Sequence, residues 1–320
     1  MSRLRLLVLP LLALAILVSG CVQQSPEGAG STTTTAASTT TTTAAQGPSW
    51  QSGGVAIAGT YGDADVVSIG GGTLRIYYSL EPEAADFQGQ VYSATSTDGR
   101  TWTQESGVRK TWSTFPSVIA LPAGGYRMYF QNAEEIKSAT SQDGLTWTDE
   151  AGTRVDKANA EGLTLQNVAA PTVLYTGGKY VMVYRATIAE RYSSDVPNSD
   201  TQLFMWAESG DGLAFEKKGI LLDSRNSQFE GLLDGPELVQ WSDGTVRLYF
   251  WTYKGVYHGT LAGGTLSAPE FDYATKQADA MNKYPSDPPC DPTLAKMGSD
   301  WFMYYGQHTK GIYFATLGSG

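Results

Sequence analysis

The sequence predicts an all-β protein, a five-bladed β-propeller whose blades are four-stranded antiparallel sheets. Three observations support this prediction. A unit of apolar strand, Gly-rich turn and aromatic strand recurs five times over residues 49–320. The strands are rich in Tyr, Phe, Met and Val, most of which are common in β-sheets. A Ser-x-Asp-Gly sequence follows the third strand in three of the units, and Asp-Gly is typical of a tight hairpin turn.

The first half of each unit is the clearest part of the repeat. Its first strand starts at an Asp or beside a Pro, and a glycine turn leads to the second strand. The five first strands start at Asp63, Phe115, Ala170, Gly235 and Asp291. The second strands lie at 74–78, 126–130, 180–184, 246–250 and 301–305.

The second half of the unit degrades along the chain. The Ser-x-Asp-Gly turns lie at 96–99, 141–144 and 209–212, whereas the fourth unit lacks one and the fifth ends after its third strand. Because an unpaired edge would remain open, we expect Trp50–Ala58 to supply the missing strand. The Asp-Gly turns resemble the Asp boxes of sialidases but are one residue short. We therefore interpret them as scaffold, with the Trp after each turn packed between blades.

The front of the chain predicts export and lipid anchoring. A short basic start precedes an apolar run, and Leu17-Val18-Ser19-Gly20-Cys21 resembles the lipobox of prokaryotic lipoproteins. We expect a lipoprotein signal peptide over 1–20, lipidation of Cys21 and a Ser/Thr-rich disordered tether over 21–48. The propeller would occupy 49–320, anchored to the cell membrane and facing away from the cytoplasm.

Charge and composition exclude several classes of function. The net charge is −10 and no basic cluster is present, so nucleic acid is not an expected partner. Only two histidines and two cysteines occur, and they do not form a zinc motif. We therefore predict no metal, no cofactor and a monomeric protein.

The geometry of a propeller places the candidate site. The starts of the first strands share one face with two long insertions, Leu80 to Gln90 and Ala186 to Gln202, and uneven loops on a regular scaffold commonly carry function. Carboxylates beside aromatic rings suit a sugar. Asp63 and Asp234 are candidate site carboxylates on this face. Candidates for substrate binding are Asp65, Trp112, Phe115, Arg185, Glu230, Glu237, Asp291 and His308.

These residues resemble the furanosidase-type propellers of glycoside hydrolase families 43 and 32, which include arabinanases, levansucrases and invertases. The resemblance implies a catalytic base at Asp63, where Ala64 replaces the family's Pro. It implies a general acid at Asp234, in Asp-Gly-Pro rather than Glu-Gly-Pro. The family's third carboxylate is missing, because Ala170 precedes Pro171. His308 is similar in place to a blade-five His of the family.

Three functions remain open at this point. The first is a glycoside hydrolase-like protein acting on extracellular carbohydrate, with paired carboxylates in the channel. The second is a carbohydrate-binding or interaction propeller whose catalytic set has eroded, which the missing acid at Ala170 favours. The third is a structural surface protein. Arg185 can either bridge a carboxylate or bind an anionic sugar.

Overall fold

The computed structural model describes residues 49–158 and 161–318, and over these ranges the regular elements are all β-strands. The predicted signal peptide, the lipidated Cys21 and the tether lie outside the described residues and stay predictions. Within the described part of the chain, no helix is long and apolar enough to cross a membrane.

The strands form five antiparallel sheets, which are the five predicted blades. Blade 1 contains β2 (Tyr61–Gly70), β3 (Thr73–Leu80), β4 (Val91–Ser96) and β5 (Thr103–Gln104). Blade 2 contains β6 (Thr114–Ala120), β7 (Tyr126–Asn132), β8 (Glu135–Ser141) and β9 (Thr148–Asp149). Blade 3 contains β10 (Leu165–Thr176), β11 (Lys179–Ile188), β12 (Thr201–Ser209) and β13 (Glu216–Leu222).

The last two blades depart from the regular pattern. Blade 4 contains β14 (Asp234–Gln240), β15 (Val246–Thr252), β16 (Gly255–Ala262) and two short strands that both pair with β16, namely β17 (Thr265–Leu266) and β18 (Glu270–Tyr273). Blade 5 contains β19 (Cys290–Met297), β20 (Asp300–Gln307), β21 (Gly311–Leu317) and β1 (Gln51–Ala58).

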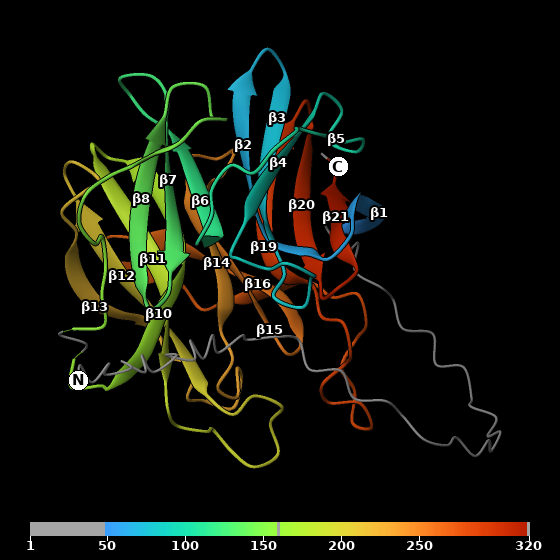
Figure 1. The fold of residues 1–320 in the computed structure, drawn as a ribbon. Helices are drawn as coiled ribbons and strands as arrows, with labels where there is room; N and C mark the ends of the chain where they lie inside the picture. The colour runs from blue at the N-terminus through green and yellow to red at the C-terminus, as the bar shows by residue number, and fades with distance from the viewer. Residues whose placement is uncertain (1–48, 159–160, 319–320) are drawn as a thin grey trace, which may run out of the picture.

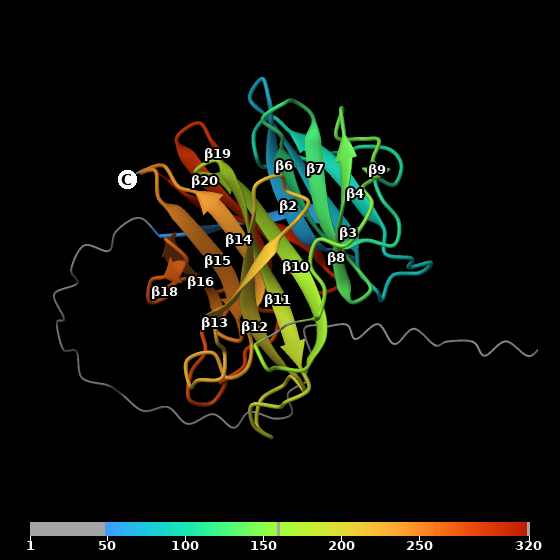
Figure 2. The same ribbon diagram turned by 90° about the vertical axis from the view of Figure 1, so that its left-hand side faces the viewer.

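The first strands close a ring. Contacts run from β2 to β6, β10, β14 and β19 and back to β2, so these strands are the inner strands of the propeller (Figures 1 and 2). The predicted ring closure is confirmed, because β1 pairs antiparallel with β21 from Gln51 to Ala58. The first strand of the domain therefore becomes the outer strand of its last blade.

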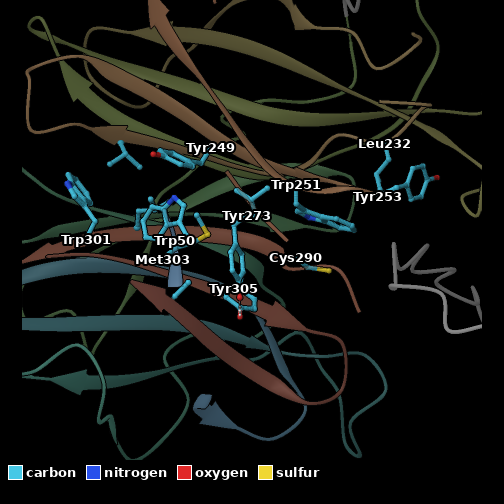
Figure 3. Packing of buried hydrophobic residues seen from close by; sticks show 14 of the residues in the cluster. Trp50, Leu232, Tyr249, Trp251, Tyr253, Tyr273, Cys290, Trp301, Met303 and Tyr305 are labelled. Atoms are coloured by element: carbon cyan, nitrogen blue, oxygen red, sulfur yellow. Dashed lines mark hydrogen bonds between the residues drawn. The ribbon is translucent and has the colours of Figure 1, made fainter. Parts of the chain in front are cut away.

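Trp50 extends this closure into the core. Its side chain is 7% exposed and packs in a cluster with Tyr249, Trp301 and Met303 (Figure 3). Trp50 directly precedes the fourth strand of its blade, as Trp102 and Trp147 precede β5 and β9. It is thus the blade-5 counterpart of the aromatic residue that follows each Asp-Gly turn.

The Asp-Gly turns fasten neighbouring blades together, as expected for scaffold. The blade-2 turn packs on blade 1, where Tyr77 Oη donates to the Gly144 carbonyl at 2.8 Å. The blade-3 turn packs on blade 2 through Tyr129 and Gly212, at 2.9 Å. The blade-1 turn packs on blade 5 through Tyr304 and Gly99, also at 2.8 Å. Trp147 packs edge-on against Tyr77, and Trp102 packs in the same way against Tyr304.

The blade-4 turn lacks these contacts. It is the short Gly263-Gly264 connection, and blade 3 presents Val181 and Val183 where blades 1 and 2 present an Arg and a Tyr. A cavity of about 490 Å³ remains there, lined by Val181, Trp206 and Gly264 among others. The lost turn and the lost Arg-Tyr pair therefore occur together.

Candidate functional site

A single backbone feature builds the centre of the channel. In every blade, two consecutive residues of the inner strand are left out of its pairing with the second strand. The first of the two has a positive φ between 45° and 54°. The five positions are Asp63, Phe115, Ala170, Gly235 and Asp291. All five blades share the feature, so the strained conformation belongs to the fold and is not peculiar to one blade.

These five residues line a pit at the start of the inner strands. The following residues, Ala64 and four prolines, complete much of its wall. Its volume is about 30 Å³, which is room for one or two water molecules. A sugar ring does not fit inside, so a glycan would have to lie above the pit.

Three acids line the pit: Asp63 from β2, Glu237 from β14 and Asp291 from β19. Trp251 Nε1 donates to Asp291 Oδ1 at 3.1 Å. A Cβ at Gly235 would lie 2.5 Å from both Cα and Oδ1 of Asp291. Glycine at 235 therefore makes the space that the Asp291 side chain occupies.

A fourth acid, Asp234, is the first residue of β14 and is not among the residues that line the pit. Its Oδ2 is 2.5 Å from Arg185 Nη1, and the two side chains are 2% and 3% exposed. The Arg185 guanidinium carbon also lies 5.2 Å from the centre of the Phe115 ring. Of the two roles open to Arg185, bridging a carboxylate is the one observed.

Burial and neighbouring charges raise the pKa values of Asp63 and Asp291. Burial, and next the charge of Asp234, raises the pKa of Asp63 from 3.8 to about 7 against the opposing effects of Arg185 and a hydrogen bond with Ser79. Burial, Asp234 and Asp63 together raise the pKa of Asp291 well above its usual value. Both carboxyls therefore hold protons at a pH where an exposed Asp is ionised.

Two of the predicted binding residues belong to a ring of hydrogen bonds deeper in the channel. Asp65 Oδ2 accepts from the Val118 backbone N–H at 2.8 Å. The hydroxyl oxygens of three further inner-strand residues likewise accept a backbone N–H from the next blade, namely Ser117, Thr172 and Thr293. The Glu237 carboxyl accepts from the backbone N–H of Leu294. Glu237 also accepts from the hydroxyls of Thr293 and Thr172 at 2.9 and 3.1 Å. Asp65 and Glu237 thus join blades, and Glu237 also lines the pit.

The other candidates lie at the rim. Trp112 is 63% exposed, and its backbone is fixed by bonds to Gln88 O and from Asn132 Nδ2. Glu230 is away from the pit and pairs with Lys283 at 2.5 Å. His308 lies in the β20–β21 turn, beside Glu81 and Glu83.

Sequence reasoning did not select Ser79, Glu81 or Glu83. Ser79 and Glu81 lie at or just after the end of the second strand of blade 1, a position that supplies polar candidates in the other blades. Burial raises the pKa of Glu81 to about 7. The signal was therefore present in the repeat itself.

Comparison with known proteins gives matches at the level of structure alone. No protein-family model and no curated sequence matches the chain. One similar structure comes from the GH130 family of mannoside phosphorylases. This family contains glycoside hydrolases that target β-1,2-mannosidic linkages in Candida mannan. The structure has a TM-score of 0.61 at 13% identity and covers 82% of this chain and 87% of that one.

Two further structures are similar over the same region. BT0996, in its complex with RGII, has a TM-score of 0.62 at 13% identity and covers 84% of this chain and 92% of its own length. A thermostable family-43 glycoside hydrolase has a TM-score of 0.58 at 15% identity and covers 83% and 91%. The chain has the fold of these glycan-active propellers. At such low identity the likeness concerns the fold, and function has to be argued from the site.

Proposed function

We propose that this protein is a cell-surface glycoside hydrolase that acts on extracellular carbohydrate from the mouth of its channel. The observation that carries the proposal is that Asp63 and Asp291, together with Glu237, line one water-sized pit. Glycoside hydrolysis needs one carboxylate as base and one carboxylic acid as proton donor. The glycoside hydrolases among the structural neighbours support the same class of activity.

The environments of the acids suggest their roles. We assign Asp63, whose pKa burial raises to about 7, as the base that activates a water in the pit. We assign Asp291, whose pKa burial raises well above its usual value, as the acid that protonates the leaving oxygen. Asp234, which the sequence selected as acid, is paired with Arg185, so we assign it to shaping the charge around Asp63 and Asp291.

None of the described residues that line the pit is a Lys or Arg, so a sugar above it would meet carboxyls and apolar side chains there. Trp112, exposed and fixed through its backbone, is placed to cover the apolar face of such a sugar.

Leaving-group dependence tests these roles. The substrates are a panel of dinitrophenyl glycosides, which need little acid assistance, and the matching oligosaccharides. We expect Asp63→Asn to lower kcat on both by about 10²–10⁴-fold. Asp291→Asn should lose oligosaccharide cleavage yet keep most dinitrophenyl turnover. If Asp234→Asn shows that pattern and Asp291→Asn does not, Asp234 is the acid.

A non-catalytic carbohydrate-binding propeller is the second candidate, favoured by Ala170 at the position where the related hydrolases have an acid. Affinity electrophoresis against soluble polysaccharides distinguishes the two functions. Retarded migration of the wild type that is lost in Trp112→Ala would establish binding. If the wild type also turned over no glycoside, hydrolysis would be excluded.

A further inference from the structure

The rim of the channel holds a group of side chains that the proposed reaction does not use. Glu81 and Glu83 follow β3 at the start of the blade-1 insertion, and His308 lies in the β20–β21 turn of blade 5. One oxygen or nitrogen from each lies within 4.8 Å of the other two. The group therefore joins two loops that are 227 residues apart in sequence, since 308 − 81 = 227.

Glu81 is held in place by its surroundings. Its Oε2 accepts the Thr309 backbone N–H at 2.7 Å, and its Oε1 lies 3.0 Å from where a Cβ at Gly62 would be. The side chain is 11% exposed. A carboxylate that is this buried and this fixed cannot turn out to water to find a counter-charge.

The charge around Glu81 and Glu83 is not balanced by protein cations. Across residues 49–158 and 161–318, the only basic side chain in an ion-pair contact with either glutamate is His308. His308 Nδ1 is 3.5 Å from Glu81 Oε2, and Nε2 is 3.5 Å from Glu83 Oε1. Among the described residues, no Lys or Arg therefore pairs with either glutamate.

We propose that Glu81, Glu83 and His308 form a binding site for a divalent transition-metal ion, with Zn²⁺ as the best-suited candidate. Zn²⁺ takes imidazole nitrogen and carboxylate oxygen at about 2.0–2.2 Å, which places tetrahedral ligands roughly 3.4 Å apart. The 3.5 Å between His308 Nδ1 and Glu81 Oε2 is close to this value, whereas the 3.5 Å to Glu83 Oε1 is measured from the other ring nitrogen.

Binding requires little rearrangement. Only one ring nitrogen of His308 can ligate the ion, so one carboxylate has to move toward it. Glu83 is 42% exposed and can change its rotamer, whereas Glu81 stays fixed. A fourth position remains open to water. The bound ion would tie the blade-1 insertion to blade 5 at the edge of the pit, whether or not the protein hydrolyses glycans.

The two histidines of the chain provide a matched test. His258 lies in blade 4, where its Nδ1 is 2.6 Å from Asp272 Oδ2, and no third metal-ligating group joins that pair among the described residues. The full chain is stripped with EDTA and titrated with Zn²⁺ by calorimetry, and Co²⁺ replaces Zn²⁺ for absorption spectra. We expect one equivalent of Zn²⁺ to bind in the micromolar range and to raise Tm by about 5 °C at saturation.

His308→Ala should abolish Zn²⁺ binding and the visible Co²⁺ bands, and His258→Ala should preserve both. Glu83→Gln, at an exposed position that tolerates substitution, should weaken Zn²⁺ binding at least tenfold and serves if His308→Ala does not fold. No Zn²⁺ binding by the wild type, or equal binding by the wild type and either rim variant, would overturn the proposal. Glycosidase activity is not part of the readout, so failure here leaves the proposed function untouched.

Discussion

Arg185 Nη1 lies 2.5 Å from Asp234 Oδ2, and the pair is almost completely buried between blades 3 and 4. Removing one partner of such a pair leaves the other charge in the protein interior without compensation. We expect Arg185→Met to lower the free energy of unfolding by about 3–5 kcal/mol in urea denaturation.

An exposed pair provides the control for this measurement. Arg225 and Asp223 are 2.8 Å apart, but their side chains are 36% and 40% exposed. Arg225→Met should therefore cost less than about 1 kcal/mol. Equal losses for the two Arg→Met variants would show that burial of the Arg185 pair carries no energetic weight.

The acids of the channel predict how stability depends on pH. Burial raises the pKa of both Asp63 and Asp65 from 3.8 to about 7. Between these two values the folded protein binds more protons than the unfolded chain, so stability falls as the pH rises. Asp98 has a lowered pKa, and its contribution changes only in more acidic solution.

We therefore expect Tm to fall between pH 5 and pH 8, and Asp65→Asn to make that fall less steep. The Asn side chain keeps an oxygen that can accept from the Val118 N–H, so the inter-blade bond can persist. Scanning calorimetry at several pH values measures the slope. A slope that is unchanged in Asp65→Asn would contradict the raised pKa of this carboxyl.

The scaffold role of the Asp-Gly turns predicts a difference between two glycines. Gly144 has a φ of 73°, and a Cβ there would lie 2.6 Å from Tyr77 Oη and still closer to Arg75 Nη1. Gly177 also has a positive φ, of 58°, but a Cβ there would meet nothing within 4 Å. Gly144→Ala should thus be the more destabilising, because it adds a clash between blades to the same backbone strain.

Thermal denaturation of the two Gly→Ala variants measures that difference. Tyr77→Phe isolates the hydrogen bond to the Gly144 carbonyl, and we expect it to cost about 1 kcal/mol. If Gly144→Ala were no worse than Gly177→Ala, the turn would not be locked against blade 1.

The sequence predicted the blades because its signals are local. Gly-rich turns, Asp-Gly hairpins and aromatic strands each specify a neighbour within a few residues, and the strand donated by Trp50–Ala58 followed from one missing edge. The replacement of an Arg by Val181, beside the cavity between blades 3 and 4, can also be seen in the repeat. Blade 3 lacks the Arg and Tyr of blades 1 and 2, and blade 4 has no Asp-Gly turn after its third strand for such a pair to fasten.

The site was predicted less completely, for two physical reasons. Alternation along a strand places Asp63 and Asp65 on one face, but the ladder skips two residues between Gly62 and Asp65. Asp63 therefore faces the pit, while Asp65 accepts from the backbone of blade 2. The pairing of Arg185 with Asp234 depends on how two blades meet, which no local pattern encodes.

The closing strand provides the last prediction. Trp50 anchors β1 in the core of blade 5, among Tyr249, Trp301 and Met303. Large-to-small changes of buried aromatics cost about 3–5 kcal/mol, so Trp50→Ala should lower the free energy of unfolding by that amount. Val55→Ala, on the same strand but with 47% of the residue exposed, is the control and should change stability little.

Because β1 joins the two ends of the ring, hydrogen exchange in Trp50→Ala should speed up in β21 as well as in β1. Faster exchange confined to β1 would show that the ring does not depend on this strand for closure.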